Sequence, residues 1–310
     1  MQVPAQVDYE RAASVEQALE LLARYGPVAR VLAGGHSLIP MMKLRLAHPE
    51  ILIDINPIAS LRYIELTGGT SGTGSSGTGR TLRIGALARH ADLLASSEAG
   101  RHFAILHDAE RVIADPVVRN WGTVGGSLCQ ADPSEDLSAA FAALKGTMII
   151  RGPGGEREVS ARAFHTGPYE TVVAADEMLT EIRLPVRTGS GSAYVKVSRR
   201  AGDWPIGAAG AAVRLADGRI EDAGIGLTAL GATHFVAAEA EEFLRGQPAD
   251  ERILAEAGRI AAEHCRPVAD QRGPVDYKRH LAQELTTRVL RLAVDRAQET
   301  PRAQGRQPAS

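Results

Sequence analysis

Two segments of the chain carry adjacent glycines beside small polar residues, and both have the composition of an anion-binding loop. In the first, Gly34 and Gly35 follow the apolar run 28–32 and precede His36 and Ser37. Backbone amides at residues without a Cβ atom can approach a bulky anion, and consecutive inward amides form an anion-binding nest. Ser37 offers a hydroxyl donor or a cap for the next helix. A plain strand–turn–helix connection explains this segment equally well.

The second double glycine, Gly125-Gly126, lies far along the chain and is flanked by the hydroxyl residues Thr123 and Ser127. Two such loops can hold a diphosphate without Lys or Arg, because backbone dipoles neutralise its charge. Asp136 follows shortly afterwards, and a carboxylate accepts hydrogen bonds from the hydroxyls of a ribose. The pair of loops therefore indicates a nucleotide-type ligand.

A third glycine-rich stretch, residues 67–79, has six glycines in thirteen residues. The run from Gly72 to Gly77 matches the G-x-G-x-x-G pattern of dinucleotide-binding folds. That pattern holds a diphosphate only where a strand leads in and a helix begins at the third glycine. Residues 81–84 are strand-like instead, so we interpret this stretch as a flexible hairpin loop without a role in nucleotide binding.

Hydrophobic periodicity predicts a mixture of helices and strands, with a small α/β block over about the first 60 residues in which the first double-glycine loop connects a strand to a helix. Ser14, with Gln17 three residues later, begins a helical pattern that ends at Gly26-Pro27. The strand-like segments are 28–32, 51–55, 61–66, 81–84, 147–151, 193–197, 207–215 and 219–230. The further helical segments are 38–46, 90–97, 101–112, 137–144, 251–264 and 278–297, with a break at Asp115-Pro116.

These patterns predict a two-part chain. Residues 1–185 form the first part, with subdomains at about 1–60 and 61–185. Pro185 and the glycine-serine run at 189–192 mark the boundary to a second domain, which covers residues 190–297. Residues 298–310 are expected to be a disordered tail.

Composition excludes several classes of protein. The 310 residues hold 35 Lys and Arg against 37 Asp and Glu, a net charge of −2, which disfavours nucleic acid as a partner. Cys129 and Cys265 are too few for a disulfide framework or a four-thiolate site, and the nine histidines show no metal-binding spacing. The N-terminus lacks a signal-peptide pattern and no apolar run approaches 18 residues, so we expect a cytoplasmic protein.

The motifs also carry a family resemblance. The segments 33–37 and 123–127 resemble the two FAD motifs of molybdenum hydroxylase flavoproteins in the xanthine oxidase family. They are most similar to the FAD-binding medium subunit of the aerobic carbon monoxide dehydrogenase type. Lys196, Arg200 and Asp203 with Trp204 resemble a further segment of that family. Ser127 departs from the pattern, because many members carry Asn there.

The resemblance implies a fold and a set of cofactor-binding residues. A two-subdomain FAD-binding region of the vanillyl-alcohol oxidase type would precede a small α+β domain with a three-stranded antiparallel sheet and helices. Asp136 would hold the ribose, Leu179 and Lys196 would lie near the flavin, and Trp204 would cover one face of its ring. The diphosphate would be held by Leu32, Ala33, Gly34, Gly35, His36, Ser37, Leu38, Thr123, Val124, Gly125, Gly126 and Ser127. No catalytic residue or metal ligand is expected on the chain.

The implied function is that of an electron-transfer flavoprotein. Substrate would be oxidised at a molybdenum cofactor on a large subunit, and two [2Fe–2S] clusters on a small subunit would pass electrons to FAD here. An external quinone, NAD or oxygen would then accept them, with the complex a dimer of heterotrimers. Location at the inner membrane face through the complex is an alternative to a purely cytoplasmic one. A stand-alone FAD oxidoreductase and an inactive flavin-site assembly module also remain open. The sequence leaves the oxidised substrate and the acceptor unnamed.

Overall fold

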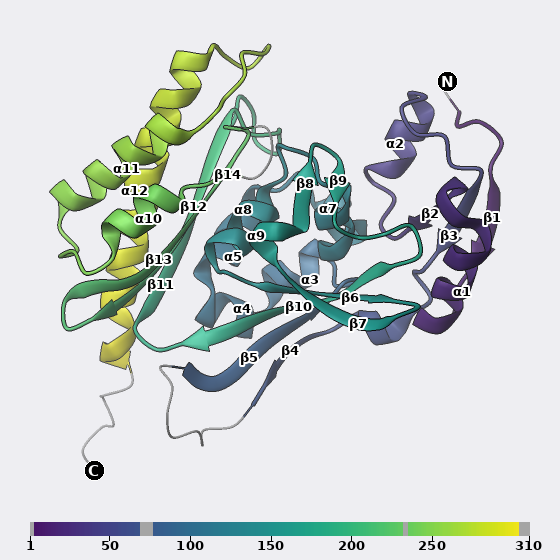
Figure 1. The fold of residues 1–310 in the computed structure, drawn as a ribbon, viewed down its shortest axis with the longest axis horizontal. Helices are drawn as coiled ribbons and strands as arrows, with labels where there is room; N and C mark the ends of the chain where they lie inside the picture. The colour runs from purple at the N-terminus through teal and green to yellow at the C-terminus, as the bar shows by residue number, and fades with distance from the viewer. Residues whose placement is uncertain (1–2, 69–76, 232–234, 304–310) are drawn as a thin grey trace.

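The computed structural model describes residues 3–68, 77–231 and 235–303. It has three successive parts, each with its own sheet (Figure 1). The N-terminal part lies at one end, the largest sheet with its helices is central, and the C-terminal sheet with three helices lies at the other end. This arrangement confirms the predicted α+β fold class.

The first part is a small parallel sheet. Strands β1 (Asp8–Arg11), β3 (Ile51–Asp54) and β2 (Ala29–Leu32) pair in that order. Helix α1 (Val15–Tyr25) lies between β1 and β2 in the chain, the one-turn helices η1 and η2 span Gly26–Val28 and Ala59–Leu61, and α2 (Leu38–Lys43) follows the first glycine loop. The expected helix 38–46 is shorter, because it ends at Lys43.

Local chemistry explains the limits of α1. The Ser14 hydroxyl accepts a hydrogen bond from the Gln17 amide at 3.1 Å, which satisfies one of the free donors of the first turn. Val15, Ala18 and Leu22 form the buried stripe of the helix. Gly26 ends it with a φ of +61°, a conformation that favours glycine.

The central part is an antiparallel sheet in the order β4-β5-β10-β6-β7. Its strands are β4 (Ile64–Thr67), β5 (Gly77–Gly85), β6 (Thr147–Gly152), β7 (Gly155–Ser160) and β10 (Met178–Arg187), while β8 (His165–Gly167) and β9 (Glu170–Thr171) form a separate ribbon. Residues 69–76 of the expected hairpin loop lie outside the described residues, and β5 begins at Gly77. The predicted boundary near 185 falls within β10.

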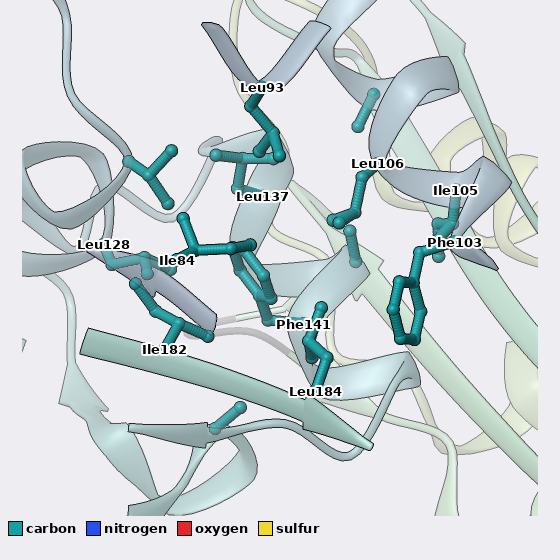
Figure 2. Packing of buried hydrophobic residues seen from close by; sticks show 14 of the residues in the cluster. Ile84, Leu93, Phe103, Ile105, Leu106, Leu128, Leu137, Phe141, Ile182 and Leu184 are labelled. Atoms are coloured by element: carbon teal, nitrogen blue, oxygen red, sulfur yellow. The ribbon is translucent and has the colours of Figure 1, made fainter. Parts of the chain in front are cut away.

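The central helices supply most of the core. They are α3 (His90–Ala95), α4 (Ser97–His102), α5 (Ala104–Val112), α6 (Pro116–Trp121), α7 (Val124–Gln130), α8 (Asp136–Ala143) and α9 (Ala161–Phe164). Phe141 of α8 is fully buried among Ile84, Ile182 and Leu184 of the sheet and Leu137 (Figure 2). The expected break at 115–116 separates α5 from α6, which begins at Pro116 because the Asp115 carboxylate accepts from the Val118 amide at 2.9 Å.

The C-terminal part has three long antiparallel strands, as expected, with a two-residue strand at the edge. The strands are β11 (Ser190–Val197), β12 (Gly207–Ala216), β13 (Arg219–Thr228) and β14 (Phe235–Val236), and the helices are α10 (Ala238–Leu244), α11 (Glu251–His264) and α12 (Val275–Ala303). Helix α12 continues past the expected start of a disordered tail at 298, and residues 304–310 lie outside the described residues.

Glycines let β13 lie directly on the main chain of α8. A Cβ at Gly224 would be 1.9 Å from the Ala143 carbonyl oxygen, and one at Gly226 would be 2.2 Å from that of Ala139. Such distances are far below van der Waals contact. The packing of the C-terminal sheet on α8 of the central part therefore depends on the absence of these two side chains.

We expect Gly224→Ala to lower the free energy of unfolding by about 3 kcal/mol, because backbone must move to admit the methyl group. Gly100→Ala is the matched control, since nothing lies within 4 Å of its Cβ position in α4. It should be neutral or slightly stabilising. Urea denaturation of the two variants measures the difference in stability. Equal stabilities would contradict the close contact between Gly224 and the main chain of α8.

Candidate functional site

The two double-glycine loops, widely separated in the chain, lie side by side. A Cβ at Gly34 would be 2.4 Å from the Trp121 carbonyl oxygen and 2.8 Å from the Gly122 Cα atom. A Cβ at Gly126 would be 3.8 Å from the Ala33 Cβ atom. The first loop (residues 33–37) thus packs main chain against main chain on the second (residues 120–127). Gly34 is required by this contact, whatever ligand the loops hold.

A polar bridge ties the same two loops together. The Arg89 guanidinium is 7% exposed and donates to the Trp121 carbonyl oxygen, and at 2.8 Å to the Asn56 side-chain oxygen. Asn56 Nδ2 in turn donates to the Ala33 carbonyl oxygen at 2.7 Å and to Asp54. Burial lowers the pKa of Arg89. Neither Arg89 nor Asn56 has a sequence motif that indicates this bridge, because the two residues and the carbonyl groups they bond lie far apart in the chain.

The first loop has the free donors that an anion requires. Within the described residues, no hydrogen-bond acceptor pairs with the amides of Gly34, Gly35, His36 or Ser37. Gly35 has a φ of +76°, and the side chain of His36 is exposed. The Ser37 hydroxyl makes no cap bond to α2, although Ser37 is the N-cap residue. These features fit a bound diphosphate, whose oxygens accept several hydrogen bonds.

The second loop differs from the sequence-based hypothesis. The Gly125 amide donates to the Ala86 carbonyl oxygen at 2.9 Å, and the Gly126 amide donates to the Thr123 hydroxyl at 3.0 Å. The hypothesis of an amide nest at this loop is therefore wrong, because Thr123 caps α7 and Ala86 occupies the donor of Gly125. Ser127 is also committed, donating to Glu135 at 2.9 Å. The part of the second loop that is exposed next to the first loop is the backbone at Gly126.

Buried Val124 and Leu179 do not reach this open edge. Val124 is fully buried, its amide donating to the Ala88 carbonyl oxygen at 2.9 Å, and Leu179 on β10 is 4% exposed within the central core. Leu32 ends β2 and its carbonyl accepts from Ile55, while Leu38 is the first residue of α2. Leu32 and Leu38 thus flank the first loop, Val124 begins α7 within the second, and Leu179 lies in the central core.

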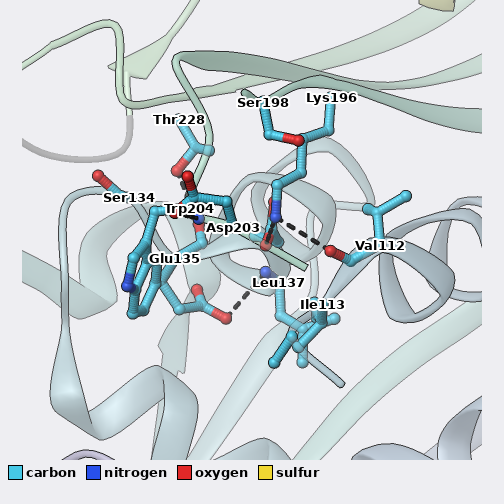
Figure 3. Close-up of polar contacts among 12 residues, drawn as sticks. Val112, Ile113, Ser134, Glu135, Leu137, Lys196, Ser198, Asp203, Trp204 and Thr228 are labelled. Atoms are coloured by element: carbon cyan, nitrogen blue, oxygen red, sulfur yellow. Dashed lines mark hydrogen bonds and ion pairs between the residues drawn. The ribbon is translucent and has the colours of Figure 1, made fainter. Parts of the chain in front are cut away.

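Asp136 and Lys196 meet in a buried cluster near the second loop. Lys196 Nζ donates to Asp136 at 2.9 Å and to the Val112 carbonyl oxygen at 3.1 Å, and the Tyr194 hydroxyl donates to the other Asp136 oxygen at 2.7 Å. Figure 3 shows Lys196 pointing between the 203–204 loop and Val112. Desolvation raises the pKa of Asp136 to about 6, despite the opposing effect of Lys196.

Trp204 lies on the loop between β11 and β12 and is 44% exposed. Two contacts shape this loop. A Cβ at Gly202, where φ is +76°, would be 2.6 Å from the Ala114 carbonyl oxygen, and the Asp203 carboxylate accepts from the Trp204 amide at 2.8 Å. The indole therefore stays available to stack on a flat ring.

Comparison with known proteins agrees with this geometry. Residues 5–187 match the family model described as "FAD binding domain in molybdopterin dehydrogenase", and residues 192–293 match "CO dehydrogenase flavoprotein C-terminal domain". The chain belongs to this family of FAD-binding medium subunits. The resemblance inferred from the glycine motifs is thus confirmed, and so is the assignment to an oxidoreductase subunit.

Relatives of this medium-subunit family match along nearly their whole length. The carbon monoxide dehydrogenase medium chain of Afipia carboxidovorans is 37% identical, covering 95% of this chain and 98% of its own. The glyceraldehyde dehydrogenase medium chain of Sulfolobus acidocaldarius is 34% identical, covering 93% and 98%. A solved carbon monoxide dehydrogenase from Hydrogenophaga pseudoflava superposes with a TM-score of 0.88 at 37% identity, covering 95% and 99%.

Two negative findings concern the described part of the flavoprotein chain. It contains no group of three or more His, Cys, Asp or Glu side chains arranged to hold a metal ion. None of its helices is both long and apolar enough to cross a bilayer.

The pKa of Asp136 predicts a pH dependence of stability. Since the folded state holds this proton more tightly than an unfolded chain, the carboxyl stabilises the fold most below about pH 4. That contribution should decline by roughly 2–3 kcal/mol as the pH rises through about 6. Urea unfolding of the wild type against Asp136→Asn across this range measures it. A wild type that instead gains stability relative to Asp136→Asn as the pH rises would show that pairing with Lys196 outweighs desolvation.

Proposed function

We propose that this chain binds FAD at the two glycine loops and passes electrons through it within a molybdenum hydroxylase complex. The observation that carries the proposal is the row of unpaired amides from Gly34 to Ser37, in a chain that matches FAD-binding medium subunits along its length. The close contact of Gly34 with Trp121 and Gly122 holds the first loop in place before a ligand binds. Binding therefore requires little reorganisation of the backbone.

Each proposed contact uses a donor, an acceptor, an aromatic ring or an open backbone position of the residues described above. The first loop holds the diphosphate through its amides and the Ser37 hydroxyl, while Gly126 leaves room beside it. Asp136 is proposed to accept from the ribose, Lys196 to lie near the flavin, and Trp204 to cover one ring face. Because Asp136 and Lys196 bond each other in the present structure, both side chains must share these bonds with the ligand.

When bound, FAD supplies a ring that accepts and releases electrons, and the protein supplies orientation and electrostatics. Lys196 places a positive charge beside the ring, which stabilises negative charge that arrives with the electrons. Asp136 and Tyr194 hold that ammonium group in position. The role of the chain is thus to position and tune the cofactor.

The partners follow from what the chain cannot hold. Each [2Fe–2S] cluster needs about four cysteine ligands, and this sequence has two cysteines. We infer that the iron–sulfur clusters and the molybdenum cofactor belong to a small and a large partner subunit, in a dimer of heterotrimers. A quinone, NAD or oxygen is the proposed acceptor. We further propose a cytoplasmic location, with contact at the inner membrane face through the complex as the alternative.

Ser37→Ala tests the diphosphate site with little damage to the fold. Its hydroxyl caps no helix, so the variant should keep wild-type stability while FAD binding weakens about tenfold, the effect of losing one hydrogen bond to a charged group. Fluorescence titration of the full chain with FAD measures the affinity.

Ser14→Ala is the matched control, because that hydroxyl does cap α1. It should lose about 1 kcal/mol of stability and leave FAD affinity unchanged. If Ser37→Ala binds FAD as tightly as the wild type, the proposed diphosphate contact is wrong. If the wild-type chain binds no FAD at all, the proposed function fails.

The complex is tested by isolating the native assembly through a tag on this chain. We expect two further subunits to copurify, with molybdenum and iron in the eluate and flavin on this chain. Substrate oxidation by the isolated chain alone, with neither metal present, would instead identify a stand-alone FAD oxidoreductase.

A further inference from the structure

A buried acid–base pair lies directly beneath the second glycine loop. His90, the first residue of α3, is 4% exposed, and Glu110 on α5 is fully buried. His90 Nδ1 lies 3.0 and 3.1 Å from the two carboxylate oxygens of Glu110. Nothing in the proposed FAD contacts uses this pair. Burying an ionisable pair costs free energy of desolvation, so we ask what its position contributes to the site.

The His90 ring supports the loop at the point where the first loop presses on it. A Cβ at Gly122 would be 2.8 Å from His90 Cδ2, and the His90 amide donates to the Gly122 carbonyl oxygen at 3.2 Å. Gly122 in turn contacts Gly34, whose Cβ position is 2.8 Å from the Gly122 Cα atom. His90, Gly122 and Gly34 are therefore packed in sequence, ending at the free amides of the first loop.

The pair also joins the two ends of the site. Glu110 belongs to α5, the helix whose last residue, Val112, accepts a hydrogen bond from Lys196. His90 is the first residue of α3, and the residue before it, Arg89, donates to the Trp121 carbonyl oxygen. A break between His90 and Glu110 would consequently separate the element that supports the diphosphate loops from the element that supports Lys196.

The pKa values of both members of this pair are raised from their ordinary values, which favours a protonated pair. Burial raises the pKa of Glu110, and the Glu110 carboxylate raises that of His90 against the effect of burial. The other charged groups that act on the pair are Arg119 on α6, which lowers the pKa of Glu110, and Glu135 with Asp136 at the start of α8, which raise that of His90. Three carboxylates thus favour the protonated imidazole.

We propose that His90 and Glu110 are positioning residues for the FAD diphosphate, holding Gly122 against Gly34 only while the pair is protonated. This rests on the proposed diphosphate site. Loss of the proton leaves a buried carboxylate facing a neutral ring, so the ion pair between the two helices is reduced to a single hydrogen bond from the imidazole to the carboxylate. The contribution of this pair to FAD affinity should therefore be complete at low pH and be lost as the pH rises through the pKa of the pair.

The test is the FAD affinity of the full chain as a function of pH. Wild-type affinity for FAD should weaken about tenfold across the transition, because the interaction between the two helices is weaker once the imidazole has lost its charge. Glu110→Gln keeps a hydrogen-bonding group but removes the charge, so the midpoint should move down by about one pH unit or more. His90→Gln should bind FAD weakly at every pH and show no transition of this origin.

Lys278→Met is the control for general destabilisation. Its amine is equally buried, bonding the Val268 carbonyl oxygen at 2.9 Å and Asp270 at 2.8 Å in the C-terminal part. This variant should lose stability and keep both the FAD affinity and the pH midpoint of the wild type.

The outcomes separate the two proposals. A wild-type chain that binds no FAD refutes the proposed function itself. A wild type that binds FAD with a midpoint unchanged in Glu110→Gln overturns the positioning role, as would an equal loss of affinity in Lys278→Met. A lowered midpoint in Glu110→Gln alone supports it, because purely structural damage does not move a titration midpoint.

Discussion

The site depends on one close approach, that of Gly34 to the main chain at Trp121 and Gly122. Two segments widely separated in the sequence touch there without any intervening side chain. The contact brings unpaired amides of the first loop to the exposed edge at Gly126. The N-terminal part meets the central one here as well as in the apolar cluster that includes Leu87 and Met178, so the geometry of the ligand site is linked to the packing of these two parts.

Buried polar groups maintain this approach from both sides. Arg89 and Asn56 bond the carbonyl oxygens of each loop, which is a more directional restraint than apolar packing. Beneath the second loop, His90 and Glu110 pair with each other. Each of these groups loses hydration on burial, and each has its hydrogen-bonding capacity largely met by a partner. Their arrangement specifies one relative position of the loops, which apolar contacts alone would leave less defined.

The two glycine loops serve different purposes despite their similar sequences. In the first, glycine permits a close contact at Gly34 and a positive φ at Gly35, and the amides remain free. In the second, Gly125 fits against Ala86 and its amide is consumed. The notion of two equivalent nests therefore fails, because Thr123 and Ala86 satisfy the donors that composition alone suggested were available.

Local signals were sufficient to predict much of the fold and the family. Ser14 and Gly26 bound α1 as expected, and the motifs around Gly34 and Gly125 identified a FAD-binding medium subunit. These features depend on neighbours in the chain, which a sequence displays directly. The break at Asp115 does separate α5 from α6, whereas the start of the disordered tail was misjudged, since helix α12 extends to Ala303.

What the sequence by itself determined was thus the presence of two glycine loops, the elements around them and the kind of ligand they suit. Only the tertiary structure decided which amides stay free, that Arg89 bridges the loops, and that His90 meets Glu110 beneath Gly122. The reason is physical. Whether a donor is available depends on which acceptor lies within about 3 Å. That acceptor can come from any part of the chain, so spacing along the sequence does not reveal it.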